Sequence, residues 1–276
     1  MAEKRYIIGC QSWGYDDWVT KADGPPVFYP RGTKQAEMLE QYTRLLETVE
    51  VDSTAYGTPA ASTFEGWTEK APSGFRFSLK VPRLITHEYS LDSRAYPIML
   101  EFCERSRVLG EHLGLILIQL PAAFESTKPN GQRLRDFLQI LPSGPRYAVE
   151  FREPGWFVHW TFEELNEAGI ALAMVEGPWV DRSVMFRSIP HLKTEHAYVR
   201  LMGERDLVKF DRVYRNRDKE LEKWAECLPK LAAGEVFIYT DNHFEGHAPA
   251  TANKLKKLLG LPLTDPGAIE AQASLF

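Results

Sequence analysis

The chain has 276 residues, of which 44% are hydrophobic and 26% are charged, and its formal net charge is −5. These values are typical of a globular protein and exclude a disordered or fibrous chain. No continuous hydrophobic stretch reaches the roughly 18 residues that a membrane-spanning helix needs, so we expect no membrane partner. The negative net charge gives no overall attraction to nucleic acid, so a polyanionic partner would need a local basic patch.

The start of the chain and the cysteines indicate the cellular compartment. The segment Met1–Gly9 passes directly into a strand-like run and lacks the hydrophobic region of a secretory signal. The three cysteines, Cys10, Cys103 and Cys227, are far apart in the sequence. This arrangement favours a reducing compartment over a disulfide framework. We therefore expect a cytoplasmic protein.

Short hydrophobic runs recur along the chain, and each is rich in the residues of strands that are covered on both faces. In chain order they are Tyr6–Cys10, Thr48–Asp52, Phe75–Val81, Leu115–Leu120, Tyr147–Phe151, Ala171–Val175, Ala197–Leu201 and Glu235–Thr240. Segments with helical spacing of hydrophobic residues lie between them. These are Lys34–Leu46, Pro97–Leu113, Arg133–Leu141, Thr161–Gly169, Arg217–Leu231 and Thr251–Leu259.

This alternation predicts an α/β fold, a single (β/α)8 TIM-like barrel over residues 1–262, with a doubly wound open sheet as the structural alternative. Two segments fit the pattern less well. Asp52–Gly74 contains prolines and a glycine that allow only a short helix, and Glu176–His196 predicts an irregular loop with at most a weak helix. Residues 263–276 have little core pattern and predict a flexible tail.

If the chain forms a barrel, the functional residues lie at the carboxyl ends of the strands. Glu50 and Glu150 each stand between hydrophobic neighbours, so we expect both to be partly buried and to need cationic partners. With Asp52 and His87, they are the candidate catalytic acids and bases. The candidate residues for binding a substrate or an anion are Lys80, Arg152, Arg200, Tyr198, Gln119, Trp13 and Asn242.

The same residue types allow other interpretations. The charged residues can form a structural ion-pair network inside the mouth of the barrel. The aromatic residues near the strand ends can line a pocket for a sugar or a base, or they can cover the barrel core. These aromatic residues are Trp13, Tyr15, Tyr56, Trp156 and Trp179.

The cofactor is not identified by the sequence, and a divalent metal ion is one option. The candidate metal ligands are Glu50, Asp52, Glu150 and Asp241, with His87, His243 and His247 as further ligands, but no compact metal-binding motif joins them. The chain has no glycine-rich dinucleotide motif after its first strand and no phosphate-binding loop, so we expect no nucleotide cofactor. Neither Ser12 nor Ser53 stands in a nucleophile elbow, which disfavours serine hydrolysis.

A series of short motifs accompanies the predicted strands. They are Ile8–Tyr15, Phe28–Pro30, Thr48–Tyr56, Phe75–Lys80, Thr86–His87, Leu113–Pro121, Val149–Arg152, Tyr198–Arg200 and Asp241–Asn242. Their order over roughly residues 6–260 resembles that of the YecE-like proteins, the family of unknown function numbered seventy-two, DUF72. The resemblance implies a TIM-like barrel and supplies no reaction.

The chain departs from this family pattern at two places. Asp52 and Ala55 stand where the family tends to have Asn and Phe, and Asp241 stands where the family often has the first of two Asn residues. Both departures add a carboxylate to the predicted pocket. They favour a cation or a metal there.

The last five residues, Gln272-Ala-Ser-Leu-Phe276, resemble the peptide by which bacterial DNA-repair and replication proteins bind the sliding clamp. Gln272 offers an amide to backbone groups, and Leu275 and Phe276 can fill a hydrophobic pocket as adjacent anchors. The predicted partner is therefore a bacterial DNA sliding clamp. The alternative is that Leu275 and Phe276 pack back on the barrel.

Three hypotheses of function follow. The first is an enzyme that acts on a phosphate-bearing substrate, either a small molecule or damaged nucleic acid, as a nuclease-like hydrolase linked to the sliding clamp. The second is an isomerase or hydrolase of a sugar or sugar phosphate. The third is a non-catalytic module that binds a ligand. The link from a barrel fold to nucleases is an analogy of fold alone.

Overall fold

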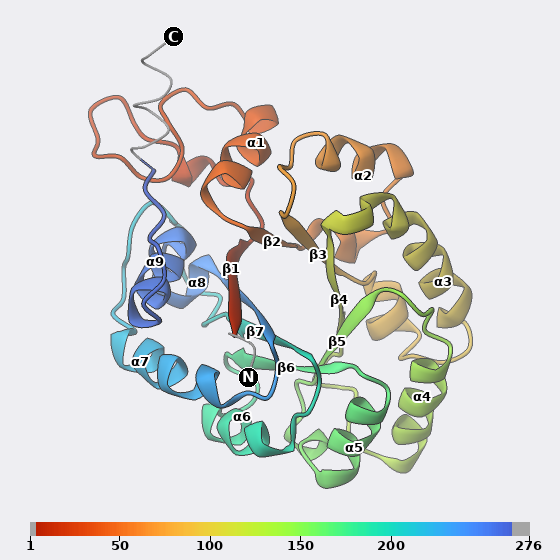
Figure 1. Cartoon of the computed structure of the whole chain (residues 1–276). Helices are drawn as coiled ribbons and strands as arrows, with labels where there is room; N and C mark the ends of the chain where they lie inside the picture. The colour runs from red at the N-terminus through yellow and green to blue at the C-terminus, as the bar shows by residue number, and fades with distance from the viewer. Residues whose placement is uncertain (1–3, 267–276) are drawn as a thin grey trace.

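The computed structural model of the chain describes residues 4–266. Eight parallel strands form a closed barrel in sequence order, because β1 pairs with both β2 and β8 (Figure 1). The strands are β1 (Arg5–Gln11), β2 (Thr48–Val51), β3 (Arg76–Lys80), β4 (Leu113–Gln119), β5 (Arg146–Glu150), β6 (Ala171–Glu176), β7 (His196–Leu201) and β8 (Glu235–Thr240). The predicted barrel is confirmed, and the pairing of β1 with β8 excludes the open sheet.

Helices surround the barrel as an outer ring (Figure 1). They are α1 (Gln35–Leu45), α2 (Ala61–Thr68), α3 (Ala95–Ser106), α4 (Lys128–Gln139), α5 (His159–Glu167), α6 (Arg182–Ser188), α7 (Asp218–Cys227), α8 (Asn242–Glu245) and α9 (Ala248–Leu258). The two segments that interrupted the sequence pattern hold the short helices α2 and α6.

Local capping explains where two helices differ from the prediction. Helix α4 begins at Lys128, five residues before the predicted start at Arg133. The Thr127 side chain accepts a hydrogen bond from Asn130 N, and Pro129 stands in the first turn. Both features favour a helix start at this point. Helix α3 ends at Ser106, and a 3-10 segment continues to His112 with Gly110 at a φ of 51°. A continuous helix over Pro97–Leu113 is therefore wrong in its last turns.

One glycine is required by the close approach of two strands. A Cβ atom added to Gly9 would lie 1.8 Å from the carbonyl oxygen of Thr48, where β1 passes β2. Such a distance is far inside van der Waals contact, so only glycine fits there. Inside the barrel, Tyr239 OH donates a hydrogen bond to Ser78 Oγ at 2.7 Å and lies 2.8 Å from Thr48 Oγ1. These contacts join β8, β3 and β2 across the interior.

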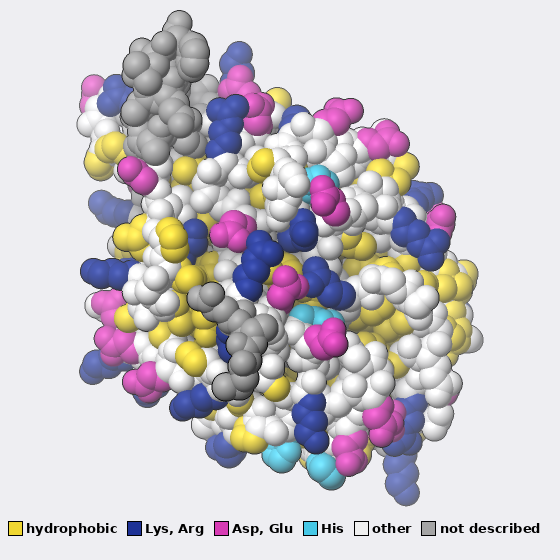
Figure 2. Space-filling model, in the orientation of Figure 1, with side chains coloured by type: hydrophobic (Ala, Val, Ile, Leu, Met, Phe, Trp, Pro, Cys, Tyr) yellow, Lys and Arg dark blue, Asp and Glu magenta, His cyan; other side chains and the backbone are white. Residues whose placement is uncertain are grey.

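The face at which the strands begin carries basic and acidic side chains side by side (Figure 2). Arg5 lies 3.5 Å from Glu47 and 3.8 Å from Glu235, and Arg146 lies 2.6 Å from the same Glu235. Pairs of this exposure each contribute about 0–1 kcal/mol to stability. These pairs match two arginines with two glutamates.

Thr264 is bound to the barrel by hydrogen bonds. Its backbone N–H donates to Asn253 Oδ1 at 2.8 Å, and its hydroxyl accepts a hydrogen bond from Lys256 Nζ at 2.8 Å. Thr264 belongs to the segment that the sequence assigned to the tail, and the structure fixes it against α9. The remainder of that tail, including Gln272, Leu275 and Phe276, lies outside the described residues. Across residues 4–266, none of the helices has the length and hydrophobicity to span a bilayer.

Candidate functional site

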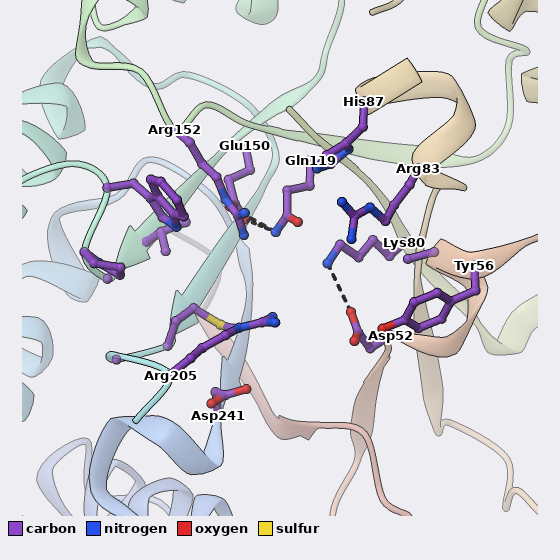
Figure 3. Close-up of a pocket in the computed structure, with 17 residues that line it drawn as sticks. Asp52, Tyr56, Lys80, Arg83, His87, Gln119, Glu150, Arg152, Arg205 and Asp241 are labelled. Atoms are coloured by element: carbon purple, nitrogen blue, oxygen red, sulfur yellow. Dashed lines mark hydrogen bonds and ion pairs between the residues drawn. The ribbon is translucent and has the colours of Figure 1, made fainter. Parts of the chain in front are cut away.

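A cavity of about 300 Å³ opens at the carboxyl ends of the strands (Figure 3). Its polar lining comes from residues that end or directly follow β2, β3, β4, β5, β7 and β8. They are Asp52, Tyr56, Lys80, Arg83, His87, Gln119, Glu150, Arg152, Arg205 and Asp241. The structure thus brings most of the predicted site residues together in one place.

A fully buried ion-pair network lies next to this cavity. Arg200 donates from Nε and Nη2 to the two carboxylate oxygens of Glu50, at 2.8 and 2.6 Å, and from Nη1 to Glu150 Oε2 at 2.5 Å. Tyr198 OH donates to Glu50 Oε2 at 2.7 Å. The ion-pair interpretation of the strand ends is therefore correct for these residues. Glu50, Tyr198 and Arg200 do not line the cavity but support its wall.

Glu150 connects the buried network to the cavity. Its carboxylate also accepts hydrogen bonds from Gln119 Nε2 at 3.0 Å and from Arg152 Nε at 2.8 Å. Burial alone would raise the pKa of Glu150, but the guanidinium groups of Arg200 and Arg152 and the Gln119 amide outweigh it and lower this pKa to about 2. Glu150 is therefore a permanent anion at neutral pH, and the role of a catalytic acid does not suit it.

Lys80 and Asp52 form an ion pair at the cavity wall. Lys80 Nζ donates to Asp52 Oδ1 at 3.0 Å, and the Lys80 side chain is 9% exposed. Burial and the Arg200 guanidinium lower the pKa of Lys80 more than Asp52, Glu50 and Glu150 raise it. Burial raises the pKa of Asp52, but Lys80, Arg200 and Arg205 together outweigh burial, and the net effect is a lowered pKa.

Two further groups can exchange protons with a ligand. Burial lowers the pKa of His87 to about 4, with further contributions from Arg83, Arg152 and Lys80, so the imidazole is neutral near pH 7. Burial raises the pKa of Asp241 to about 6, although its carboxylate accepts a 2.6 Å hydrogen bond from His243 N. Asp241 is thus the carboxyl of this cavity whose charge changes closest to neutrality.

Arg83 and Arg205 are cavity residues that were not among the predicted site residues. Both guanidinium groups extend toward the centre of the cavity (Figure 3). Within the part of the chain that the structure describes, neither guanidinium makes a hydrogen bond or an ion pair. Arg83 stands three residues after β3 ends at Lys80, and Arg205 stands four residues after β7 ends at Leu201. Extending the search one turn beyond each strand would have found both.

Several predicted residues lie elsewhere. Trp13 packs edge-on against Trp67 with the ring centroids 5.7 Å apart, away from the cavity. Asn242 is buried and accepts hydrogen bonds from Trp18 Nε1 at 3.1 Å and from Ala248 N at 2.9 Å, so it fixes a loop. The prediction that these two residues bind the substrate is therefore not supported by their positions.

The aromatic residues divide between the two interpretations that the sequence left open. Trp156 stacks against Phe124 and Phe151 in the core. Tyr56 and Trp179 line the cavity instead and are 80% and 49% exposed, and the Arg152 guanidinium lies 5.2 Å from the Trp179 ring.

The four predicted metal-ligand carboxylates do not converge. Glu50 and Glu150 are bound to Arg200, Asp52 is bound to Lys80, and Asp241 accepts from the backbone of His243. His247, a further candidate, has Nδ1 2.8 Å from the carbonyl oxygen of Phe210. Across the residues that the structure describes, no group of three His, Cys, Asp or Glu side chains is placed to hold a metal ion.

The fold and the cavity define a (β/α)8-barrel protein whose charged pocket lies at the carboxyl ends of the strands. Residues 7–273 match the family described as "Protein of unknown function DUF72", and the chain belongs to this family. The resemblance stated from the sequence motifs is thereby confirmed.

Relatives and solved structures agree with this assignment. The chain is 24% identical to the UPF0759 protein YecE of Escherichia coli K12, over 98% of this chain and 99% of that protein. It is similar in structure to a DUF72 family protein of Enterococcus faecalis V583, with a TM-score of 0.73, 21% identity, and coverage of 95% of this chain and 100% of the other. A DUF72 family protein of Thermotoga maritima MSB8 also gives a TM-score of 0.73, with 24% identity and coverage of 93% and 99%.

Proposed function

We propose that the protein is an enzyme that binds a small phosphate-bearing substrate in the cavity at the strand ends. One observation carries this proposal: Arg83 and Arg205 both extend into the same cavity, and neither makes a hydrogen bond or an ion pair within residues 4–266. Arginine presents a planar set of N–H donors that matches phosphate oxygens. Because these guanidinium groups form no ion pair with the protein, an anion can bind them without an existing ion pair being broken.

The charges around the cavity support an anionic ligand. Four cations, Lys80, Arg83, Arg152 and Arg205, line it together with three acids, Asp52, Glu150 and Asp241. Asp52 is neutralised by Lys80, and Glu150 by Arg152 and Arg200. Asp241, whose pKa is raised to about 6, is mostly ionised at pH 7 and offsets one positive charge. The two remaining guanidinium groups outweigh this single carboxylate and give the cavity a positive field.

The size of the cavity favours a small molecule over a nucleic-acid duplex. A volume of about 300 Å³ is at the lower end of the usual range for ligand pockets. A sugar phosphate fits such a volume. Nucleic acid remains the alternative, in which a single extruded nucleotide would enter and the exposed Tyr56 and Trp179 rings would stack on a base.

Catalysis, rather than binding alone, is favoured by the groups that can move protons. Asp241 changes its charge near pH 6, and the His87 imidazole is neutral at pH 7. An acid or base that titrates near the working pH is the usual requirement for proton transfer to a substrate. A module that only binds has no need of such groups.

The proposal is tested by calorimetric titration with inorganic phosphate and with a panel of sugar phosphates. Replacing Arg83 and Arg205 by Gln is expected to weaken phosphate binding by about tenfold or more for each arginine, since a hydrogen bond to a charged group contributes about 1.5–3 kcal/mol. The matched control replaces Arg31 and Arg133, two exposed arginines away from the cavity, and changes the net charge by the same amount. Equal affinities of the two double variants would refute the proposal.

The C-terminal peptide supports a separate proposal, that the protein docks on a bacterial sliding clamp. Its only support is the sequence Gln272-Ala-Ser-Leu-Phe276, which lies outside the described residues. Docking would raise the effective concentration of the cavity near DNA. A fluorescent clamp-binding peptide should be displaced by the full chain but not by a variant with Leu275 and Phe276 replaced by Ala. Replacing Ser274, a variable position, is the control and should leave displacement intact.

A further inference from the structure

Lys80 is an amine enclosed in the wall of the cavity. Its side chain is only 9% exposed, yet the residue lines the cavity, and its Nζ lies beside Asp52 at the open space (Figure 3). Among the cavity-lining residues of the described chain, it is the one lysine. An anion-binding role alone does not require burial, because the exposed Arg83 and Arg205 already serve it.

The backbone of Lys80 is held firmly in place. Its N–H donates to Thr54 Oγ1 at 3.0 Å, and the same hydroxyl donates to the Lys80 carbonyl oxygen at 2.6 Å. The Thr54 side chain therefore forms hydrogen bonds with both backbone polar groups of Lys80, the last residue of β3. Only the side chain remains adjustable, and its Nζ is directed to one side of the cavity. Fixed groups of this kind reduce the entropy lost when a reacting atom is positioned.

The surroundings of Nζ suit a nucleophile. Burial and the nearby Arg200 guanidinium lower the pKa of Lys80, so a larger share of the amine is unprotonated near pH 7 than for an exposed lysine. Asp52 lies 3.0 Å from Nζ and fixes the position of the amine at the cavity wall. Asp241 lines the same cavity and can supply a proton.

We infer that Lys80 forms a Schiff base with an aldehyde or ketone group of the substrate, while Arg83 and Arg205 hold the phosphate of that substrate. The chemical class is a phosphate-bearing carbonyl compound. A free sugar phosphate in its open-chain form and an abasic deoxyribose in DNA both contain this chemistry. The inference rests on the proposed anion site and adds a covalent step to it.

The step balances without a further reactant. The unprotonated Nζ adds to the carbonyl carbon, and a proton passes from nitrogen to the carbonyl oxygen, which gives a carbinolamine. The carbinolamine oxygen takes a second proton from an acid such as Asp241 and leaves as water. The nitrogen lone pair forms the C=N bond of the iminium ion. The iminium then withdraws electrons from the neighbouring carbon–hydrogen or carbon–carbon bond, as isomerisation or cleavage of a sugar phosphate requires.

The test is reductive trapping. The full chain is incubated near pH 7 with glyceraldehyde phosphate or with ribose phosphate, sodium cyanoborohydride is added, and each lysine adduct is located by peptide mass spectrometry. We expect Lys80 to be modified at least about tenfold faster than the exposed Lys223, and inorganic phosphate to slow the adduct at Lys80 only. The second arm of the experiment uses an oligonucleotide with an abasic site. If only this oligonucleotide is trapped at Lys80, the substrate is DNA.

Variants separate this inference from the proposed function. Lys80→Arg keeps a positive charge beside Asp52 but has no amine that can form an imine, so it should give no adduct at this position. Lys223→Arg, an exposed and unpaired control, should leave trapping at Lys80 unchanged. Arg83→Gln with Arg205→Gln should slow trapping of glyceraldehyde phosphate, while trapping of unphosphorylated glyceraldehyde should not change.

The outcomes are distinguishable. If calorimetry shows that phosphate binds but Lys80 is modified no faster than Lys223 by every carbonyl compound, the Schiff base is refuted and the anion site stands. If phosphate does not bind, the proposed function and the inference both fail. Equal trapping of phosphorylated and unphosphorylated glyceraldehyde would overturn the assignment of Arg83 and Arg205 to the substrate phosphate.

Discussion

Replacing Arg200 by Met is the most direct perturbation of the buried network. The Arg200 side chain is fully buried and donates three hydrogen bonds to Glu50 and Glu150. Methionine is unbranched, matches the aliphatic stem of arginine and has no charge, so the substitution removes the cation and keeps part of the buried packing. It leaves two carboxylates in the barrel interior. Glu150 retains Arg152 and Gln119, whereas Glu50 retains only the hydroxyl of Tyr198.

The size of the effect follows from the ionisation of Glu150. Its pKa falls from an ordinary 4.5 to about 2, a difference worth about 3 kcal/mol at 1.36 kcal/mol for each pKa unit. The charge of Arg200 is the first of the contributions that lower this pKa, followed by those of Arg152 and Gln119, so part of that free energy depends on Arg200. Removing one partner of a buried ion pair costs about 3–5 kcal/mol. We expect Arg200→Met to reduce the free energy of unfolding by that amount near pH 7.

The loss should depend on pH in a defined direction. In the wild-type protein the folded-state pKa of Glu150 is depressed, so its contribution is complete above about pH 4.5 and is lost as the pH falls toward 2. Without Arg200, burial of Glu150 is opposed only by Arg152 and Gln119 among the groups named above, so its folded-state pKa is higher and it takes up a proton at a higher pH than in the wild type. The difference between the variant and the wild type is therefore largest near pH 7 and becomes smaller as the pH falls to 4.

The assay is urea unfolding followed by tryptophan fluorescence at pH 7, 5 and 4, with the slopes compared to confirm that the same transition is measured. Glu50→Gln combined with Arg200→Met removes one charge of each sign and should recover at least half of the loss. Glu50→Gln alone is a milder variant that remains measurable if Arg200→Met does not fold. A loss below about 1 kcal/mol near pH 7, or one of equal size at pH 4, would refute the reasoning, because exposed ion pairs contribute that little.

Two further predictions concern the cavity and the barrel wall. Deprotonation of Asp241 adds a negative charge beside the anion site. Sulfate affinity should therefore fall by up to about tenfold as the pH rises through about 6, because an interaction of one pKa unit corresponds to a tenfold change in affinity. Asp241→Asn should remove this step in a calorimetric pH series, and a step that persists in the variant would contradict the assignment. Gly9→Ala should lower the free energy of unfolding by at least about 3 kcal/mol in the same unfolding assay, because the added Cβ would overlap Thr48 O. This value is the upper part of the usual cost of overpacking. Gly66→Ala in α2, where a Cβ meets no atom within 4 Å, is the control and should gain about 0.5–1 kcal/mol.

The barrel and the core of its charged site follow from local patterns. The strand assignments hold to within about two residues because each buried parallel strand is a short hydrophobic run bounded by turn residues. The meeting of Glu50, Glu150 and Arg200 could also be predicted. A charge between hydrophobic neighbours on a strand must be buried, and parallel strands place such charges at the same end of the barrel.

The roles of these residues were harder to predict than their positions. Whether Glu150 is an acid or a permanent anion depends on how many hydrogen-bond donors reach its carboxylate. These donors are Gln119, Arg152 and Arg200, which come from three different strands or the loops after them. The directions of Arg83 and Arg205 depend on loop geometry, for which no period exists in the sequence. Trp13 failed as a ligand residue for the same reason, because the loop after β1 turns it against Trp67.

Two kinds of charge therefore meet at this end of the barrel, and they perform different tasks. Glu50, Arg200 and Glu150 are buried and bound to one another by hydrogen bonds, so they fix the geometry of the wall. Arg83 and Arg205 make no hydrogen bond or ion pair within residues 4–266, and we propose that they bind an anion. The groups left to exchange protons are Lys80, whose pKa is lowered, and Asp241, whose pKa is raised to about 6. An amine and a carboxyl whose pKa values are shifted toward each other in one cavity form an acid–base pair suited to carbonyl chemistry near pH 7.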